Sequence, residues 1–309
     1  MLISLKPEAL QDAIKRACHL ETAALKPGNV SRYREGHGMT VQDFLASAEA
    51  IAVPMTAPDS SIGERIFNSV QATRDMVSLN TNLGIILLFA PVIHAALSLE
   101  PERSLKTRLE RHLLVLDLMD AELAFKAICT AAPGGLGEAP RHDVKRPAEV
   151  TLLHAMKEAK SRDLVARQYA NGYRDVFEVG LRRARSALTQ WHNPEWVAVA
   201  VYLAFLARFP DSLIARKYGA PAAREVSVRA GELEARLNRE TQPENLVPAL
   251  LEWDGELKNA GLNPGTSADL TAATLLILDV QERLAKRVPG KQPVCSETWD
   301  YPHTPAIRG

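Results

Sequence analysis

The chain has 309 residues and a formal charge of zero, with 37 Lys and Arg against 37 Asp and Glu. At roughly 150 residues per domain, this length allows one or two domains with a sizeable core. A neutral chain lacks the basic excess that non-specific binding to DNA or RNA requires, so we expect no nucleic-acid partner. Hydrophobic residues at 46% and charged residues at 24% exclude the disordered, collagen-like and disulfide-scaffold classes.

Three cysteines without CxxC spacing argue against a zinc site or a disulfide framework and favour a reducing compartment. The first seven residues become polar too early for a signal peptide. The most apolar stretch, residues 83–97, is interrupted by Pro91 and His94 and falls short of the about 18 apolar residues that span a bilayer. We therefore expect a cytoplasmic protein with no membrane partner.

Helical periodicity dominates the chain, and alternating β patterns are nearly absent. Pro7 suits the first turn of a helix that ends at residues 26–28, where Pro27 disfavours a helical conformation of the residue before it. Thr40 is placed to cap the next helix. Further helices are predicted over residues 61–78, 82–97, 105–130, 148–160, 175–191, 194–208, 221–240, 244–260 and 267–287. The sequence predicts an all-α fold.

We predict one compact multi-helix domain over residues 1–288 and an irregular C-terminal tail, rich in Pro and polar residues, over 289–309. One Gly- and Pro-rich interruption, residues 133–147, is about as long as the loops that are usually functional or linking. We favour a functional loop within one domain over a linker between two. Scattered Leu residues on the predicted helix surfaces are compatible with a homodimer and equally with a monomer.

Four short polar segments, which we call polar islands, interrupt the helical pattern. The first contains Glu21, Lys26 and Asn29. Glu21 lies on the last turns of the first helix, just before a rigid turn that carries a cation and an amide. A structural interpretation is open here, because a Lys near a helix C-terminus interacts favourably with the helix dipole and Pro-Gly ends the helix.

The second island, Asn80, Thr81 and Asn82, directly precedes the most apolar helix. Asn80 or Asn82 can cap that helix, whose free N–H groups and dipole form an anion site. Capping alone also explains these residue types, so a structural role and a phosphate-binding role both stay open.

The third island contains Asp211, Arg216 and Lys217. The Asp211 carboxylate could bind Mg²⁺, and the two basic side chains could neutralise phosphate. A helix cap at Asp211 followed by a solvated basic turn is an evenly matched alternative. In the fourth island, Ser267 can cap the last long helix and Asp269 falls in its first turn, where an acid is also favourable for structural reasons.

Taken in order, the islands resemble the triphosphoribosyl-dephospho-CoA synthase family. The resemblance begins at Glu21 and continues through Lys-Pro-Gly-Asn-Val at residues 26–30 and Asn-Thr-Asn-Leu-Gly at 80–84. It ends with Asp211 and with Pro-Gly-Thr-Ser-Ala-Asp-Leu at 264–270. It implies an all-helical enzyme that uses ATP and a divalent metal, Mg²⁺, to transfer the triphosphoribosyl unit of ATP onto dephospho-CoA. Adenine is released, and the product is the precursor of a carrier-protein prosthetic group.

The resemblance also implies roles for individual residues. Glu21, Asp211 and Asp269 would act as catalytic carboxylates and metal ligands, because breaking the bond between ribose and adenine develops oxocarbenium character and the attacking hydroxyl needs a base. Nucleotide-binding roles fall on Lys26, Asn29, Asn80, Thr81, Asn82, Arg216, Lys217 and Ser267. The implied partners are small-molecule nucleotide substrates.

Two motifs depart from the family pattern. Familiar members read Lys-Pro-Gly-Leu-Val-Asp where this chain has Asn29 and Ser31, and Asn-Thr-His-Lys-Gly where it has Asn82 and Leu83. The changes remove an acid, an imidazole and a cation, and they are similar to a divergent branch among archaeal and methylotroph-type relatives. Three functions stay open: triphosphoribosyl transfer in cofactor biosynthesis, different chemistry in making a one-carbon carrier such as tetrahydromethanopterin or methanofuran, and a non-catalytic scaffold that binds nucleotides.

Overall fold

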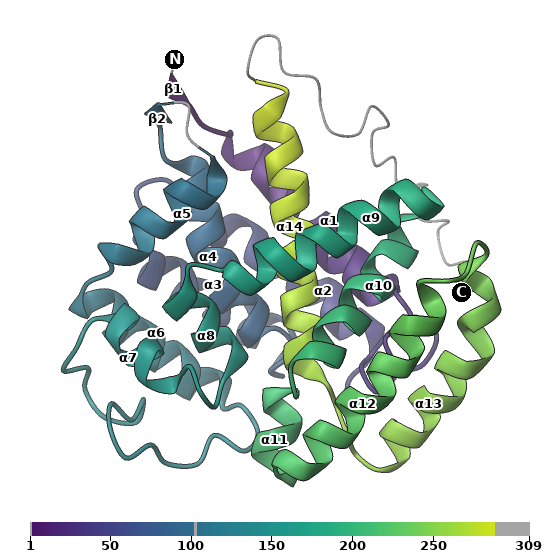
Figure 1. Ribbon diagram of the computed structural model, residues 1–309. Helices are drawn as coiled ribbons and strands as arrows, with labels where there is room; N and C mark the ends of the chain where they lie inside the picture. The colour runs from purple at the N-terminus through teal and green to yellow at the C-terminus, as the bar shows by residue number, and fades with distance from the viewer. Residues whose placement is uncertain (1, 102–103, 288–309) are drawn as a thin grey trace.

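The computed structural model describes residues 2–101 and 104–287, and helices form most of that part of the chain (Figure 1). In chain order, the helices are α1 (Pro7–Ala23), α2 (Val41–Met55), α3 (Ile62–Val77), α4 (Leu83–Leu97), α5 (Leu105–Leu114), α6 (Leu118–Ala131), α7 (Leu152–Ala159), α8 (Leu164–Asn171), the π-helical turn η1 (Val176–Gly180), α9 (Leu181–Trp191), α10 (Pro194–Arg208), α11 (Ser212–Tyr218), α12 (Ala220–Leu237), the 3₁₀ turn η2 (Pro243–Leu246), α13 (Val247–Asn259) and α14 (Gly265–Ala285). Two short strands, β1 (Leu2–Ile3) and β2 (Glu100–Pro101), pair antiparallel. The all-α prediction is confirmed.

Most of the predicted helices begin at a capping residue that the sequence displays. Thr40 caps α2 and Ser61 caps α3, each with reciprocal bonds to the acid three residues later. Helix α10 covers its predicted range, since Asn193 caps it and Pro194 occupies its first position. These signals act over a few residues, which is why they can be recognised without the tertiary structure.

Two predicted ranges are wrong in detail, and two short helices were not predicted. The helix expected over 105–130 is two helices, because Asp117 forms a capping box that starts α6. The helix expected over 175–191 opens with the π-helical turn η1 before α9. Helices α8 and α11 were not predicted; each has only seven or eight residues and starts at an aspartate cap, Asp163 or Asp211.

Three helices, α4, α10 and α14, form the centre of the molecule, and their residues are buried almost all round. Helix α14 runs through the middle of the view in Figure 1, where it packs against α1, α4 and α10. Helices α5 to α8 lie on one side of it, α9, α10, α12 and α13 lie on the other, and α11 lies at its lower end in this view. Both groups share one apolar core, so the described residues form a single compact domain.

The central helix α4 contains Pro91, which has no backbone N–H and therefore frees the carbonyl group of Leu87 four residues earlier. The hydroxyl group of Tyr169, on α8, donates to that carbonyl oxygen at 2.6 Å. Tyr173 donates in the same way to the carbonyl oxygen of Leu88 at 2.9 Å. The two tyrosines satisfy buried backbone groups and hold α8 against α4.

The loop over residues 133–147 joins α6 to α7, and these two helices pack against each other. It is therefore a loop within one domain, as expected, rather than a linker between domains. The predicted tail, residues 289–309, lies outside the described residues. In the described ranges no single helix has both the length and the apolarity needed to cross a membrane, and α10 with α11 reaches those limits only as a pair bent by 49°.

Candidate active site

A cavity of about 960 Å³ opens beside the N-terminal ends of α4 and α14. Its volume lies at the upper end of the about 300–1,000 Å³ that is typical of small-ligand sites. Its wall takes residues from α1, the turns before α4 and α14, the loop over 133–147, the α7–α8 turn, α11 and α12. Eight of the predicted site residues line it: Glu21, Asn29, Asn80, Thr81, Asn82, Arg216, Lys217 and Asp269.

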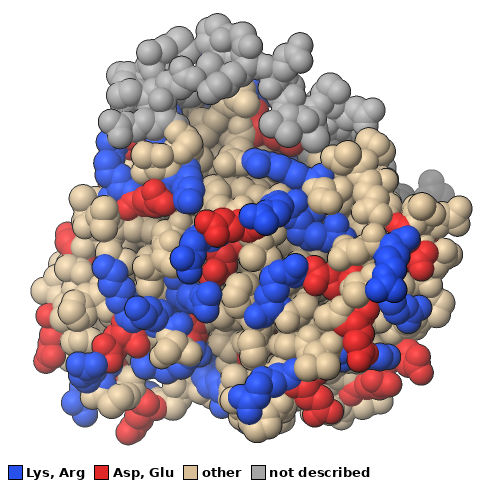
Figure 2. Space-filling view, in the orientation of Figure 1, with Lys and Arg blue, Asp and Glu red and all other residues tan. Residues whose placement is uncertain are grey.

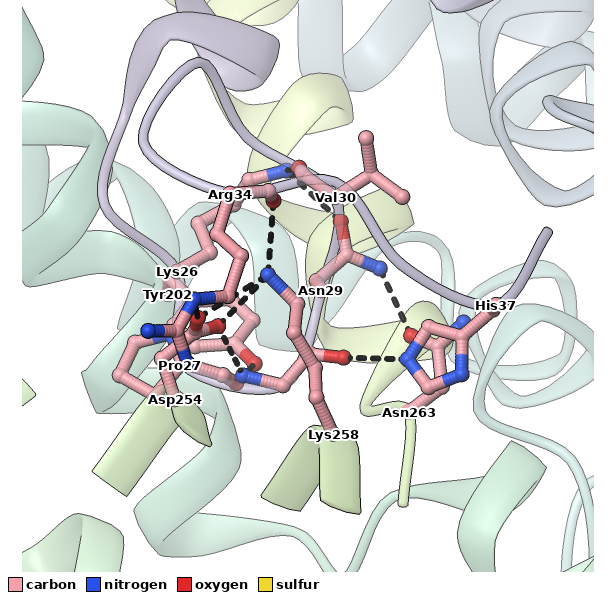
Figure 3. A network of polar contacts seen from close by, with 11 residues as sticks. Lys26, Pro27, Asn29, Val30, Arg34, His37, Tyr202, Asp254, Lys258 and Asn263 are labelled. Atoms are coloured by element: carbon pink, nitrogen blue, oxygen red, sulfur yellow. Dashed lines mark hydrogen bonds and ion pairs between the residues drawn. The ribbon is translucent and has the colours of Figure 1, made fainter. Parts of the chain in front are cut away.

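The turn after α1 is held in place by helices that are distant in sequence (Figure 3). Tyr202 on α10 donates its hydroxyl hydrogen to the carbonyl oxygen of Pro27 at 2.6 Å, and the amide of Gly28 donates to the Asp254 carboxylate on α13 at 2.9 Å. Gly28 has φ of +82°, and a Cβ there would lie 2.8 Å from Pro264. Both facts require glycine at position 28.

The same network continues around the buried carboxylate of Asp254. Lys258 forms an ion pair with that carboxylate at 2.9 Å and donates to the carbonyl oxygen of Arg34 at 2.7 Å. Farther along the turn, Asn29 donates to the side chain of Asn263 at 2.8 Å (Figure 3). The turn therefore has one conformation fixed by side chains from three other segments.

This rigid turn places Lys26 against Glu21, and both side chains are almost completely buried. The Lys26 ammonium group forms an ion pair with Glu21 and also donates to Asn29 Oδ1 at 2.8 Å and to the carbonyl oxygen of Val30 at 3.1 Å. Burial lowers the pKa of Lys26, and the neighbouring Glu21 carboxylate opposes that change. All three ammonium hydrogens have protein acceptors and Lys26 does not line the cavity, so its nucleotide-binding role stays a prediction.

Asp269, in the first turn of α14, presents its carboxylate to the cavity beside Glu21. A Cβ on Gly84 would overlap this carboxylate, which places Asp269 against the first turn of α4. No hydrogen bond or ion pair from the described residues reaches the Asp269 side chain. Burial and the negative charges of Glu21 and Asp211 raise the pKa of Asp269 well above its usual range. Asp269 therefore lies beside the Glu21–Lys26 ion pair without a partner of its own, and it gains from a proton or a cation.

Asp211 has the helix-capping role, which is one of the two that the sequence left open. One of its carboxylate oxygens accepts from the amides of Leu213 and Ile214 and caps α11, and the other accepts from the amide of Ser267 at 2.7 Å and from its hydroxyl group at 2.8 Å. Burial raises the pKa of Asp211 although these hydrogen bonds oppose the change. Neither Asp211 nor Ser267 lines the cavity. Their side chains are hydrogen-bonded to each other and join the start of α11 to the first turn of α14.

The predicted set of three carboxylates does not come together as metal ligands. In the described part of the chain, no three His, Cys, Asp or Glu side chains are grouped so that they could hold a metal ion. Glu21 and Asp269 reach the cavity, whereas both oxygens of Asp211 are occupied by protein donors. A metal ion here would therefore take two protein carboxylates at most, with the remaining ligands supplied by a substrate.

The three residues of the second island have different surroundings: Asn80 and Thr81 bond to protein groups, whereas Asn82 has an unused donor. Asn80 Oδ1 accepts from the amide of Leu83, the first residue of α4, at 3.3 Å, while Asn82 occupies the N-cap position without a side-chain cap bond. The Thr81 hydroxyl group bonds to that of Ser47 at 2.6 Å. Asn82 is only 5% exposed and lines the cavity, and its buried Nδ2 has no acceptor among the described residues. Asn82 is therefore the residue of this island with an unused donor for a ligand.

Sequence reasoning missed several basic residues of the cavity wall: Lys160, Arg162, Arg167 and Arg224. Arg167 forms an ion pair with Asp175 at 2.8 Å, and Arg216 forms one with Asp163 at 3.4 Å. Lys160 and Arg162 lie in the exposed turn between α7 and α8, Arg167 lies within α8, and Arg224 lies on an exposed face of α12. Basic side chains are common at such positions. The sequence carries no signal that separates them from an ordinary solvated surface.

The fold and the cavity define an all-helical protein in which carboxylates and basic side chains line one polar site. The chain belongs to the CitG family, described as ATP:dephospho-CoA triphosphoribosyl transferase, which it matches over residues 7–288. The resemblance found in the motifs is thereby confirmed. The fold is also similar to the crystal structure of a protein from Archaeoglobus fulgidus described as a candidate triphosphoribosyl-dephospho-CoA synthase, with a TM-score of 0.58 and 23% identity. That alignment covers 75% of this chain and 96% of the other. A search of curated proteins gave no match.

Proposed function

We propose that this protein transfers the triphosphoribosyl unit of ATP to a hydroxyl group of a nucleotide-type acceptor, with Mg²⁺ bound and adenine released, in cofactor or prosthetic-group biosynthesis. Membership of a family of ATP-dependent triphosphoribosyl transferases supports the donor and the type of reaction. The observation that carries the proposal is the Asp269 carboxylate, which has no partner in the described residues and lies beside the Glu21–Lys26 ion pair at the cavity wall.

In the proposed reaction, the bond between ribose C1 and the adenine nitrogen breaks, and the acceptor oxygen forms a new bond to C1. The bonding electron pair leaves with adenine, which gains a proton, while the acceptor hydroxyl group loses its proton. We assign that proton to Asp269, because its carboxylate lines the cavity and has no hydrogen-bond or ion-pair partner among the described residues. Glu21, held in place by Lys26, would stabilise the positive charge that develops on the ribose.

The donor set fits a hard cation such as Mg²⁺, because the Asp269 and Glu21 oxygens face the cavity and one of the two carboxylates lacks a counter-ion. Mg²⁺ is usually bound through one or two carboxylates together with substrate phosphates, which agrees with the absence of a third available acid among the described residues. Bound at Glu21 and Asp269, the ion would supply positive charge that offsets the charge of the triphosphate.

The test is the release of free adenine from ATP in the presence of Mg²⁺ and dephospho-CoA, measured by chromatography. We expect Asp269→Asn to lower the rate by about 100-fold or more, since it removes the base. Asp279→Asn is the matched control, because Asp279 lies on the same helix but pairs with Arg16 and Arg283 away from the cavity.

Two outcomes would contradict the proposal. ATP consumption without free adenine would favour different chemistry, of the kind that assembly of a one-carbon carrier needs. Nucleotide binding with no turnover of ATP would favour a non-catalytic scaffold. Equal rates for Asp269→Asn and Asp279→Asn would remove Asp269 from the mechanism even if adenine is formed.

A further inference from the structure

The cavity wall also carries basic side chains that form no contact with the Glu21 and Asp269 carboxylates. Four basic residues line the cavity and form no ion pair with any acid in the described residues: Lys160, Arg162, Lys217 and Arg224. All four are exposed, as is the acid Glu138 of the same wall, whereas Glu21 is 1% exposed, so the four basic residues lie on the outer wall and Glu21 on the inner one. We call these four residues the cationic rim. The formal charge of the whole chain is zero, and on the face shown in Figure 2 basic and acidic side chains are interspersed.

The segments that carry the rim are fastened to one another. The amide of Leu164, just after the α7–α8 turn, donates to the Ser212 hydroxyl group on α11 at 3.0 Å. Arg216 on α11 joins the same turn through its ion pair with Asp163. Helix α12, which carries Arg224, packs against α11. The four charges are therefore held on connected elements around one cavity rather than on independent surface segments.

The loop over 133–147 closes directly onto this wall. The carbonyl oxygen of Gly134 accepts from Arg216 Nε at 3.3 Å, and a Cβ on Gly134 would lie 2.8 Å from Cε of Lys217. Gly135 has φ of +73°, and a Cβ there would lie 3.3 Å from Arg216 and from Lys217. The paired glycines let the main chain lie against the two basic side chains, which a bulkier residue would displace.

We propose that the cationic rim is a metal-independent subsite for a linear di- or triphosphate. Four positive charges around one opening match the several negative charges of such a chain, and ammonium and guanidinium groups form strong charge-assisted hydrogen bonds with phosphate oxygens. When no metal ion is bound, the Glu21 and Asp269 carboxylates repel phosphate, so a polyphosphate chain binds at the rim. That the natural ligand is a phosphate ester of a substrate rests on the proposed function. That the rim binds inorganic polyphosphate does not depend on it.

The experiment is calorimetric titration of inorganic triphosphate and of pyrophosphate into the protein with a metal chelator present. We expect measurable binding that weakens with added salt, because the rim charges are exposed and screened. The variant Lys160→Gln/Arg162→Gln/Lys217→Gln/Arg224→Gln should bind about 30-fold or more weakly. The matched control is Lys145→Gln/Lys157→Gln, which removes two exposed lysines from the same region that do not line the cavity.

The titrations also decide whose phosphates the rim holds. If saturating ATP abolishes the binding of both probes, the rim holds the triphosphate of the donor. If pyrophosphate still binds with ATP present, the rim holds a diphosphate of the acceptor. The Asp269→Asn variant should lose adenine formation but still bind triphosphate without metal. A failure of the proposed reaction can therefore be told apart from a failure of phosphate binding at the rim. Unchanged binding in the fourfold variant, or binding that strictly requires Mg²⁺, would overturn the inference.

Discussion

Replacing Lys26 by Met separates the structural role of the Glu21–Lys26 ion pair from its catalytic one. The substitution leaves the Glu21 carboxylate buried at 1% exposure with no cation beside it, next to the second acid Asp269. Removing one partner of a buried ion pair costs about 3–5 kcal/mol, because the remaining charge is desolvated and uncompensated. The amide oxygen of Asn29 and the carbonyl oxygen of Val30 also lose their donor. We expect a loss of about 3–5 kcal/mol in the free energy of unfolding by urea.

The double variant Glu21→Gln/Lys26→Met tests whether the unpaired charge of Glu21 is the cause of the expected loss of stability. Because it removes both charges, it should recover most of the stability, to within about 1.5 kcal/mol of the wild type. Its adenine formation should fall far below the wild-type rate, since the carboxylate that stabilises the ribose is gone. Urea unfolding followed by circular dichroism measures the coupling between the two sites as a double-mutant cycle. Equal destabilisation of the single and double variants would refute the reasoning, because the buried charge would then not be its source.

Three further substitutions or conditions test other parts of the structure. Gly84→Ala places a methyl group where the Asp269 carboxylate lies, so adenine formation should fall about tenfold or more while urea stability changes little. Tyr169→Phe leaves the buried carbonyl oxygen of Leu87 without its donor and should cost about 1–3 kcal/mol of unfolding free energy. Burial lowers the pKa of His94 to about 4, so the unfolded chain binds the proton first as pH falls below about 6.5. Stability should therefore fall by about 1–2 kcal/mol between pH 7 and pH 5, and His94→Gln should remove that part of the pH dependence.

The helices illustrate which parts of the fold local sequence can predict. Helices α2 and α3 begin at Thr40 and Ser61, whose capping boxes are complete within four residues. Helix α11 was missed because seven residues are too few to establish a helical period. The break between α5 and α6 was missed because the periodic pattern continues across it while Asp117 starts a new helix.

The candidate site was predicted in part by the order of its motifs. That order identified the family, and it singled out Glu21 and Asp269, which the structure brings to one cavity. It could not distinguish Asp269 from Asp211, because the two acids look equally suited to a metal in the sequence. Asp211 is occupied by the Ser267 donors, 56 positions away in the chain, and only the packing of α11 on α14 reveals this.

By itself, the sequence of this protein determined the helical class, most helix starts and the family, since periodicity, capping and motif order are all properties of residues near one another in the chain. The tertiary structure alone decided which polar side chains face the cavity and which face a protein partner. Lys26 is saturated by Glu21, Asn29 and Val30, and the cationic rim assembles from turns and helices that only the completed core brings together. The physical reason is that a buried polar group must find a partner, and whether that partner is protein or ligand depends on contacts between distant segments.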